Sequence, residues 1–398
     1  MTAVFYAIQE GHAHLINLLI SSRDGAAMQR YDALSYATLL EKLEMMQLMI
    51  DAKAPLERPN ITETYSWNKH EDSSPLARAI GNNNLVAMQL LLDAKAKIVV
   101  PGTNYTYHLM RHAIQTSSTR DTGDAMRLLL DSNASPMVKS QEKTLLRDAV
   151  EKNRPAIAKM LIELNASPDV IYGKKNQDTP LSIATRCRYT EMVKVLIDGK
   201  ANVNLRPKEK PTPLACAAEN EHVEVVRLLL EGKASLDNVD DRGWNAIRYA
   251  IPFHGDCDPA QISIIKMLVE AKAPLESVGR LENTMNFISP RTNLARVLVD
   301  CKANVDVICE GGQTLLMKAI RLSSIEMIET VLSGDPASFD AQDEDGMTAL
   351  MLTVFYYGSR DADAERSRVL RMLLEYAWAH CAAEHSDEPV AKRFKRME

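Results

Sequence analysis

Aromatic residues and long apolar runs are scarce in this sequence. Its 398 residues include 21 aromatics, made up of 6 Phe, 3 Trp and 12 Tyr. No stretch approaches the roughly 18 consecutive apolar residues that a membrane-spanning helix requires. The N-terminal segment MTAVFYAIQEGH lacks the basic start and apolar core of a secretory signal. We therefore expect an intracellular chain, in the cytoplasm or nucleus, with no membrane segment.

Cysteines and net charge are also low. The six cysteines are scattered and form no CxxC pair, which argues against a disulfide framework and indicates a reducing compartment. The chain has 47 basic and 53 acidic residues, and 47 − 53 leaves a net charge of −6 that is spread along its length. A diffuse attraction to nucleic-acid phosphates is therefore not expected. Apolar residues make up 46%, which is ample for a folded core.

One short phrase recurs along the chain. DAKA occupies residues 51–54 and 93–96, and variants of it begin at 131, 163, 198, 231, 270 and 300. Each of the eight copies follows three apolar residues, and successive copies lie 30 to 42 residues apart. Self-similarity at this period indicates an array of stacked supersecondary units.

A second recurring segment lies roughly 20 residues before the phrase, as expected for a repeat of two short helices. It reads TPLSIA at 179–184 and TPLACA at 212–217. Thr212 is suited to cap a first helix, and Pro213 to fill its first position, where a missing N–H costs nothing. The second helix, near 223–231, has an apolar stripe too wide for one surface helix. The units must therefore stack on one another.

The phrase itself marks the end of the second helix. A residue in the left-handed conformation is common just past a helix, and Asn133 and Asn165 fit that position. In six other copies a lysine stands there, which would cost about 1–2 kcal/mol on steric grounds. These are Lys53, Lys95, Lys200, Lys233, Lys272 and Lys302.

A unit of about 33 residues that opens with TPLxxA and closes with LLLxxxA is similar to the ankyrin repeat. The segments 241–246 and 345–349 resemble the β-turn of that family. The resemblance implies an all-α solenoid of stacked helix–turn–helix units with β-hairpin loops. Eleven units can be counted by the small residue of each first helix: Ala7, Ala37, Ala79, Ala113, Ala149, Ala184, Ala217, Ala250, Ser289, Ala319 and Thr353.

The expected solenoid spans residues 1–377, with degenerate units near 284–306 and 345–377. Residues 378–398 should form the end of a capping helix and a flexible basic tail. They are too few for a catalytic domain, so we expect no enzyme. The resemblance instead implies a protein-binding scaffold that uses hairpins and first helices along a concave face. We expect a monomer that binds another protein.

Extended loops between units carry a large share of the few aromatic and basic side chains. Because Tyr, Trp and Arg anchor many protein interfaces, we predict a protein-binding rim there. The alternative is that the rings pack against their own hairpins. The predicted binding residues are Tyr65, Trp67, Tyr105, Tyr107, Tyr172, Arg206, Lys208, Lys210 and Trp244.

Some first helices carry a polar residue just before the small one, which could tune the binding face or could be a solvated face. These residues are Arg78, His112, Asp148 and Lys318. A nucleic-acid reading through Lys174, Lys175 and the basic 204–211 loop conflicts with the acidic net charge.

The C-terminus ends in a basic cluster that follows Pro389. Lys392, Arg393, Lys395 and Arg396 resemble a short nuclear import signal, which would bind a nuclear import receptor. Solvated charge in a tail is the alternative. Ankyrin arrays also occur among proteins that intracellular bacteria deliver into hosts, so a host-delivered effector is a further reading.

The segment HGDCD at 254–258 suggests a metal-dependent enzyme as a reading of another class. Zinc sites normally add a second ligand pair at a separate spacing, and none is evident nearby. We therefore expect a polar insertion between helices, without metal or cofactor.

Overall fold

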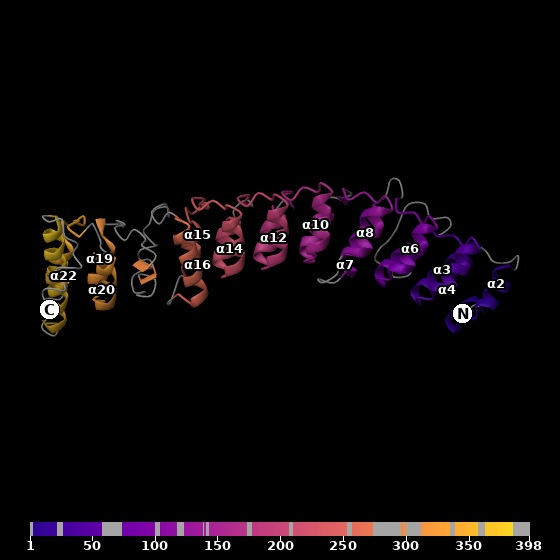
Figure 1. Cartoon of the computed structure of the whole chain (residues 1–398), viewed down its shortest axis with the longest axis horizontal. Coiled ribbons are helices and arrows are strands. Elements are labelled where there is room, and N and C mark those ends of the chain that lie inside the picture. The colour runs from indigo at the N-terminus through magenta and orange to yellow at the C-terminus, as the bar shows by residue number, and fades with distance from the viewer. Residues whose placement is uncertain are drawn as a thin grey trace. The chain divides into compact units, whose positions relative to one another are not determined.

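The computed structural model divides the chain into two compact units, Met1–Asn202 and Val203–Glu398. It describes residues 3–21, 27–57, 74–99, 104–117, 123–137, 139–140, 143–172, 177–206, 210–252, 257–273, 296–297, 299–300, 312–334, 339–356 and 363–384. In each unit, paired helices stand side by side, and loops that join consecutive pairs run along one edge (Figure 1).

The first compact unit contains six helix pairs among its described residues. The first helices of the pairs are α1 (Ala3–Glu10), α3 (Ala27–Leu39), α5 (Pro75–Gly81), α7 (Tyr105–Thr116), α9 (Leu145–Glu151) and α11 (Pro180–Arg186). The second helices are α2 (Ala13–Ser21), α4 (Leu43–Asp51), α6 (Leu85–Asp93), α8 (Asp124–Asp131), α10 (Pro155–Glu163) and α12 (Thr190–Asp198).

The second compact unit has the same organisation. Its described first helices are α13 (Pro213–Glu219), α15 (Ala246–Ala250), α19 (Leu315–Arg321) and α21 (Ala349–Tyr356). Its second helices are α14 (Val223–Glu231), α16 (Pro259–Glu270), α20 (Ile325–Ser333) and α22 (Asp363–Glu384). A pair at the ninth position would fall on 284–306, which lies almost wholly outside the described residues, so the count of eleven stays a prediction.

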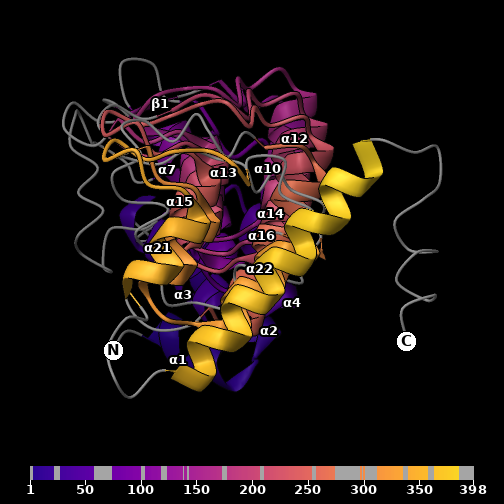
Figure 2. The same cartoon turned by 90° about the vertical axis from the view of Figure 1, so that its left-hand side faces the viewer.

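Each unit has two layers. First helices pack on first helices, as in α1–α3–α5–α7–α9–α11, and second helices pack on second helices, as in α14–α16. Figure 2 shows the two layers end-on, with α1, α3 and α7 in one and α2, α4 and α10 in the other. The apolar faces of both layers form the core. This arrangement confirms the predicted all-α solenoid.

First helices begin as the sequence predicts. The hydroxyl of Thr212 accepts a hydrogen bond of 3.2 Å from the Ala215 N–H, and Pro213 occupies the first turn. Thr179 forms a full capping box with Ser182. Because these caps satisfy N–H groups that the helix leaves unpaired, they fix where each first helix starts.

Second helices end on residues in the left-handed conformation, which confirms the prediction for the recurring phrase. Lys53, Lys95, Lys200, Lys233 and Lys272 have φ of 56°, 67°, 65°, 61° and 64°, and Asn133 and Asn165 have 74° and 68°. The N–H of the alanine that follows bonds back into the helix, as from Ala201 to the Leu196 carbonyl at 2.9 Å. Lys302 lies outside the described residues.

The acidic residue of the phrase has a local partner one turn earlier. The Gln47 amide donates to Asp51 at 2.9 Å, and the Gln89 amide donates to Asp93 at 2.8 Å. Lys159 and Glu163 lie 4.0 Å apart with the same spacing. Pairs at i,i+4 contribute a few tenths of a kcal/mol, which offsets the unfavourable position of an acid at a helix C-terminus.

Hairpin loops link each pair to the next. Strand β1 (Lys139–Ser140) pairs antiparallel with β2 (Lys143–Thr144). Elsewhere a loop side chain accepts a backbone N–H of the following loop, as Asp169 does from Asn202 at 2.8 Å and Asn204 from Ser235 at 2.8 Å. These bonds join neighbouring loops at two places, one in each compact unit.

Two further features bear on the predicted boundaries. Residues 251–258 separate α15 from α16, whereas only 82–84 separate α5 from α6. Helix α22 has 22 residues and is the longest helix described. The division at 377/378 remains a prediction, and the described helices include none long and apolar enough to cross a membrane.

Candidate functional site

The segment DDRGW at 240–244 forms a tight turn that presents an indole ring. Gly243 has φ of 77°, and its N–H donates to the Asp240 carbonyl at 3.0 Å. The Asp240 carboxylate accepts the N–H groups of Arg242 and Trp244, each at 2.9 Å. The turn therefore holds Trp244 directly before Asn245, which caps α15.

Two arginines and a tyrosine surround the Trp244 ring. The Arg248 guanidinium lies 4.5 Å from the ring centroid and that of Arg242 lies 5.2 Å away. The Tyr249 ring meets the indole edge-on at 5.5 Å, with an angle of 71° between the planes. Trp244 is half-buried, Arg248 is buried and Arg242 is exposed. One side of the cluster is thus fixed in the protein while Arg242 faces solvent.

The Asp240 carboxylate links the turn to α15. Its second oxygen accepts the Tyr249 hydroxyl at 2.7 Å. Burial acts to raise the pKa of Asp240, but the bonds from Tyr249, Trp244 and Arg242 outweigh it and hold that pKa below its usual value. Burial and the neighbouring Asp240 charge raise the pKa of Tyr249. Asp240 therefore stays ionised and orients both aromatic side chains.

Arg206, on the preceding loop, reaches the same turn. Its guanidinium forms an ion pair of 2.8 Å with Asp241. The structure thus brings together two residues predicted separately, Arg206 and Trp244. Lys210 is half-buried on the same loop, and Lys208 lies outside the described residues. We call Arg206, Asp241, Arg242, Trp244 and Tyr249 the Trp244 cluster.

Three tyrosines predicted for the binding rim are buried, and two of them lie in a helix instead of a loop. Tyr105 and Tyr107 lie within α7, and each is 2% exposed, while Tyr172 is 1% exposed. The Tyr105 hydroxyl lies 2.7 Å from the Ser74 hydroxyl, and that of Tyr172 lies 3.0 Å from the Thr144 hydroxyl. Ser74 and Thr144 cap α5 and α9, so these rings join consecutive pairs instead of facing solvent.

Tyr107 belongs to a buried polar group between α7 and α9. Its hydroxyl donates to Asp148 at 2.6 Å, and Arg111 lies 3.4 Å from the other carboxylate oxygen. Burial and the bond to Asp148 raise the pKa of Tyr107. Burial, with the nearby Arg111 charge, lowers the pKa of His108. The sequence suggested that Asp148 could adjust the charge of the binding face. It is instead buried, and its carboxylate contacts Tyr107 and Arg111.

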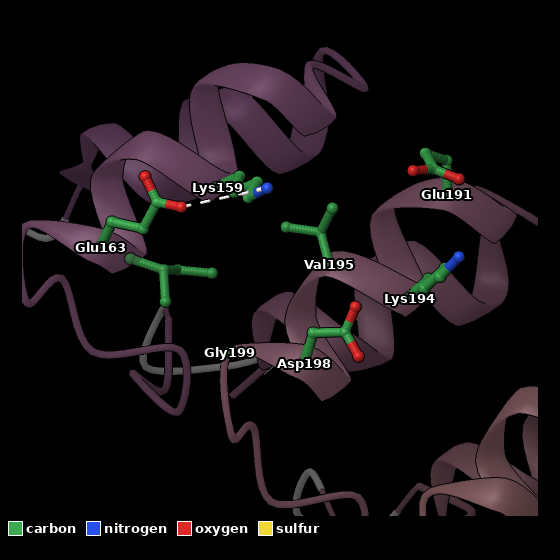
Figure 3. A pocket seen from close by; sticks show the side chains of 8 residues that line it. Lys159, Glu163, Glu191, Lys194, Val195, Asp198 and Gly199 are labelled. Atoms are coloured by element: carbon green, nitrogen blue, oxygen red, sulfur yellow. Dashed lines mark ion pairs between the residues drawn. The ribbon is translucent and has the colours of Figure 1, made fainter.

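A hollow of about 340 Å³ lies between α10 and α12 in the layer of second helices (Figure 3). It is lined by Ile162, Val195 and Gly199 and by five charged side chains, those of Lys159, Glu163, Glu191, Lys194 and Asp198. Figure 3 shows Val195 pointing from α12 towards α10, the Lys159–Glu163 ion pair on α10, and Glu191, Lys194 and Asp198 on the side of α12. The lining offers charges of both signs but no nucleophile paired with a general base.

The remaining predicted sites are only partly covered by the structure. Tyr65, Trp67, His254, Asp256 and the basic cluster at 392–396 lie outside the described residues. Cys257 is buried, and Asp258 caps α16 through its carboxylate. Within the described ranges, no group of three or more His, Cys, Asp or Glu side chains could hold a metal ion.

Residues 109–207 and 181–277 match the family of ankyrin repeats in three copies. These matches support an ankyrin-repeat family protein, with the recognised repeats in residues 109–277. The match includes the TPLSIA and TPLACA segments and the Trp244 cluster. Ankyrin repeats generally mediate protein–protein interaction, and the ankyrin-repeat fold is typically a non-enzymatic interaction domain.

One curated relative is FPV022 of Fowlpox virus (strain NVSL), which is named as an ankyrin repeat protein. It is 26% identical over 201 residues, which are 50% of this chain and 32% of the relative. The match thus spans about a third of that relative.

Solved ankyrin repeat structures are similar at low identity. The human ASB11 ankyrin repeat domain is 20% identical with a TM-score of 0.44, covering 61% of this chain and 98% of that one. The ankyrin repeat domain of Bcl-3, a member of the IkappaB family, is 18% identical with a TM-score of 0.35, covering 75% and 98%.

Proposed function

We propose that this ankyrin-repeat chain is a non-enzymatic scaffold that binds a partner protein through its hairpin loops, with the Trp244 cluster as an anchor. The observation that carries the proposal is the half-buried indole held between Arg242 and Arg248 on a turn fixed by Asp240. Tryptophan and arginine are over-represented among the residues that dominate binding energy. A ring that is already oriented loses little conformational freedom when a partner covers it.

Burial decides which of the predicted residues belong to this surface. Tyr105, Tyr107 and Tyr172 have no exposed ring to offer a partner, so they are left out. Arg206 remains, because its ion pair with Asp241 places it beside the Trp244 turn. Tyr65, Trp67 and Lys208 stay in the proposal from their sequence positions alone.

Substitution of Trp244 tests the surface. Proximity labelling in cells would compare the wild-type chain with Trp244→Ala and with Arg242→Ala. The matched control is Trp378→Ala, because Trp378 is 64% exposed on α22 and does not belong to the Trp244 cluster. We expect both cluster variants to lose the same labelled partner while the control retains it. An anchor of about 2 kcal/mol corresponds to a roughly 30-fold loss of affinity.

Arg242→Ala guards against an unfolding artefact. Arg242 is exposed and covers one face of the indole, so its removal should leave the fold intact. Thermal unfolding followed by circular dichroism would verify this. Identical partner sets for the wild type and both cluster variants would reject the Trp244 cluster as the binding surface.

We further propose that the basic cluster at the C-terminus binds a nuclear import receptor. The support is the sequence KRFK at 392–395 followed by Arg396, in a segment that begins with Pro389. Residues 389–398 fused to a fluorescent protein too large to diffuse through nuclear pores should accumulate in the nucleus. Lys392→Ala combined with Arg393→Ala should abolish that accumulation. A wild-type fusion that stays cytoplasmic would refute the proposal.

A further inference from the structure

The N-terminal helix pair leaves apolar side chains uncovered. Tyr6 on α1 is 59% exposed, and Leu15 and Leu18 on α2 are 37% and 69% exposed. Helix α2, with the sequence AHLINLLIS, contains no Asp, Glu, Lys or Arg. We call Tyr6, Leu15 and Leu18 the N-terminal face.

The register of the repeat shows what this face corresponds to. Leu15 lies four residues after Gly11, which has the left-handed conformation in the turn between α1 and α2. The residue at the same position in eight other second helices is at most 3% exposed. These residues are Met45, Ala87, Ala125, Ile157, Met192, Val225, Ile264 and Met327.

Tyr6 follows the same rule. It directly precedes the small residue Ala7, and its counterparts on the other described first helices, such as Tyr36, Arg78 and Ile183, are buried or half-buried. The pair α1–α2 packs on α3 and α4. The N-terminal face therefore corresponds to the side on which each described inner pair packs against the pair before it.

We propose that two copies of the chain associate through the N-terminal face, with α1 and α2 of one copy stacked on α1 and α2 of the other around a twofold axis. The face is equivalent to one side of the stacking interface that joins consecutive pairs of the array. Two identical faces without formal charge can meet without repulsion. A twofold contact uses each face once, so assembly stops at the dimer.

The other second helices are less suited to such a contact. Most of them carry a charged or amide residue one turn before an acid, as in Lys159–Glu163 and Gln89–Asp93. Burying those side chains would remove their hydration without supplying better partners. Helix α2 has no such pair of polar side chains, which favours the N-terminal face for self-association.

Sedimentation equilibrium of the full chain over the micromolar to submillimolar range tests the proposal. The weight-average mass should rise from the 44.4 kDa of one chain towards twice that value and then level off. The double variant Leu15→Glu with Leu18→Glu should stay at the mass of one chain. A charge on each leucine position should weaken association by about 100-fold or more, since an unpaired buried charge is strongly unfavourable.

A matched control uses leucines that are exposed elsewhere in the first compact unit. Leu39 and Leu164 are 46% and 42% exposed, so Leu39→Glu with Leu164→Glu adds the same charges away from the N-terminal face. This control should associate like the wild type. Leu18→Glu alone repeats the test at the most exposed leucine, where folding is least affected, and circular dichroism verifies the helix content.

Three outcomes would overturn the proposal. A wild-type chain that keeps the mass of one copy at every concentration would show that the face does not pair with itself. A double variant that associates as tightly as the wild type would place the contact elsewhere. A mass that grows beyond two copies would indicate head-to-tail stacking onto a different face, which excludes the twofold arrangement.

Discussion

The Tyr105 hydroxyl lies 2.7 Å from the hydroxyl of Ser74, the residue that caps α5 in the preceding pair. Ser74 also accepts the Ala77 N–H at 3.1 Å, so one hydroxyl serves both the helix cap and the contact between units. Tyr172 and Thr144 repeat the arrangement between a later loop and α9 at 3.0 Å. Tyrosines of one helix pair thus form hydrogen bonds with the residues that cap the first helix of the preceding pair.

Tyr105→Phe removes only the hydroxyl from this contact. Ser74 keeps its cap, so the loss should be that of one buried hydrogen bond, about 1 kcal/mol. Urea unfolding should show a lower midpoint with an unchanged slope. Tyr6→Phe is the control, because Tyr6 is 59% exposed, and it should leave the midpoint unaltered. An equal response of both variants would contradict a specific role for the Tyr105–Ser74 contact.

Asp343 should make the second compact unit sensitive to acid. Burial acts to raise the pKa of Asp343, but the N–H groups of Met347 and Asp345 and the Arg321 guanidinium outweigh it, so the folded-state pKa is lowered. A lowered carboxyl pKa contributes stability above the unfolded value, about 3.9, and loses it as the pH falls through the folded value.

The measurement is the free energy of unfolding of the wild type and Asp343→Asn as a function of pH. At neutral pH the variant should be less stable, because Arg321 loses its 2.9 Å partner. The gap should narrow below about pH 4, where the wild-type carboxyl also becomes neutral. A gap that stays constant down to strongly acidic pH would show that the charge of Asp343 is irrelevant.

Local chemistry explains why the repeat could be predicted from sequence. A cap such as Thr212, a proline at the first position and a left-handed residue such as Lys200 each depend on neighbours within one helical turn. The caps and left-handed helix ends expected from the sequence are therefore present at these positions, whereas α7 begins earlier than expected, at Tyr105. The acidic residue at the helix end is also explained locally, because a side chain four residues earlier bonds to it, as Gln47 does to Asp51.

The binding surface was harder to predict because ring burial depends on residues far along the chain. Tyr105 and Ser74 are 31 positions apart, and nothing near Tyr105 in sequence announces its partner. Arg206 and Asp241, whose ion pair joins two loops of the binding surface, are 35 positions apart. The spacing of Asp240 and Gly243 was the one available signal, since it matches the turn of Asp343 and Gly346.

Replacing a lysine by glycine should stabilise the protein at a left-handed position and destabilise it inside a helix. Lys200 has φ of 65°, so Lys200→Gly relieves a steric cost of about 1–2 kcal/mol. Part of this gain is offset by about 0.5–1 kcal/mol of added freedom in the unfolded chain and by the lost charge at the helix end. We expect a net stabilisation of roughly 0.5 kcal/mol.

Lys194→Gly is the matched control, because Lys194 lies inside α12, six residues earlier. There glycine should destabilise by about 1 kcal/mol, since the helix interior has no steric cost to relieve. Urea unfolding of both variants against the wild type checks the pair. Destabilisation of similar size at both positions would mean that Lys200 is not strained by its conformation.

A substitution at Gly199 measures how tightly the end of α12 packs against the preceding helix pair. Ala52 and Ala94 occupy the equivalent position in earlier copies, so alanine is compatible with the helix end itself. At Gly199, however, an added Cβ would lie 2.8 Å from Ile162 Cγ2 and 3.1 Å from the Val195 carbonyl oxygen. Gly199→Ala should therefore destabilise the first compact unit by about 1–3 kcal/mol through overpacking.

A double-mutant cycle with Ile162→Ala separates this clash from a backbone effect. Truncating Ile162 removes the atom that the new methyl group would meet, so the cost of Gly199→Ala should shrink markedly in that background. The coupling should exceed about 0.5 kcal/mol, because contacting residues are not additive. If Gly199→Ala costs the same with and without the Ile162 side chain, the cause lies in the backbone at 199, and the packing between α10 and α12 is looser than the structure indicates.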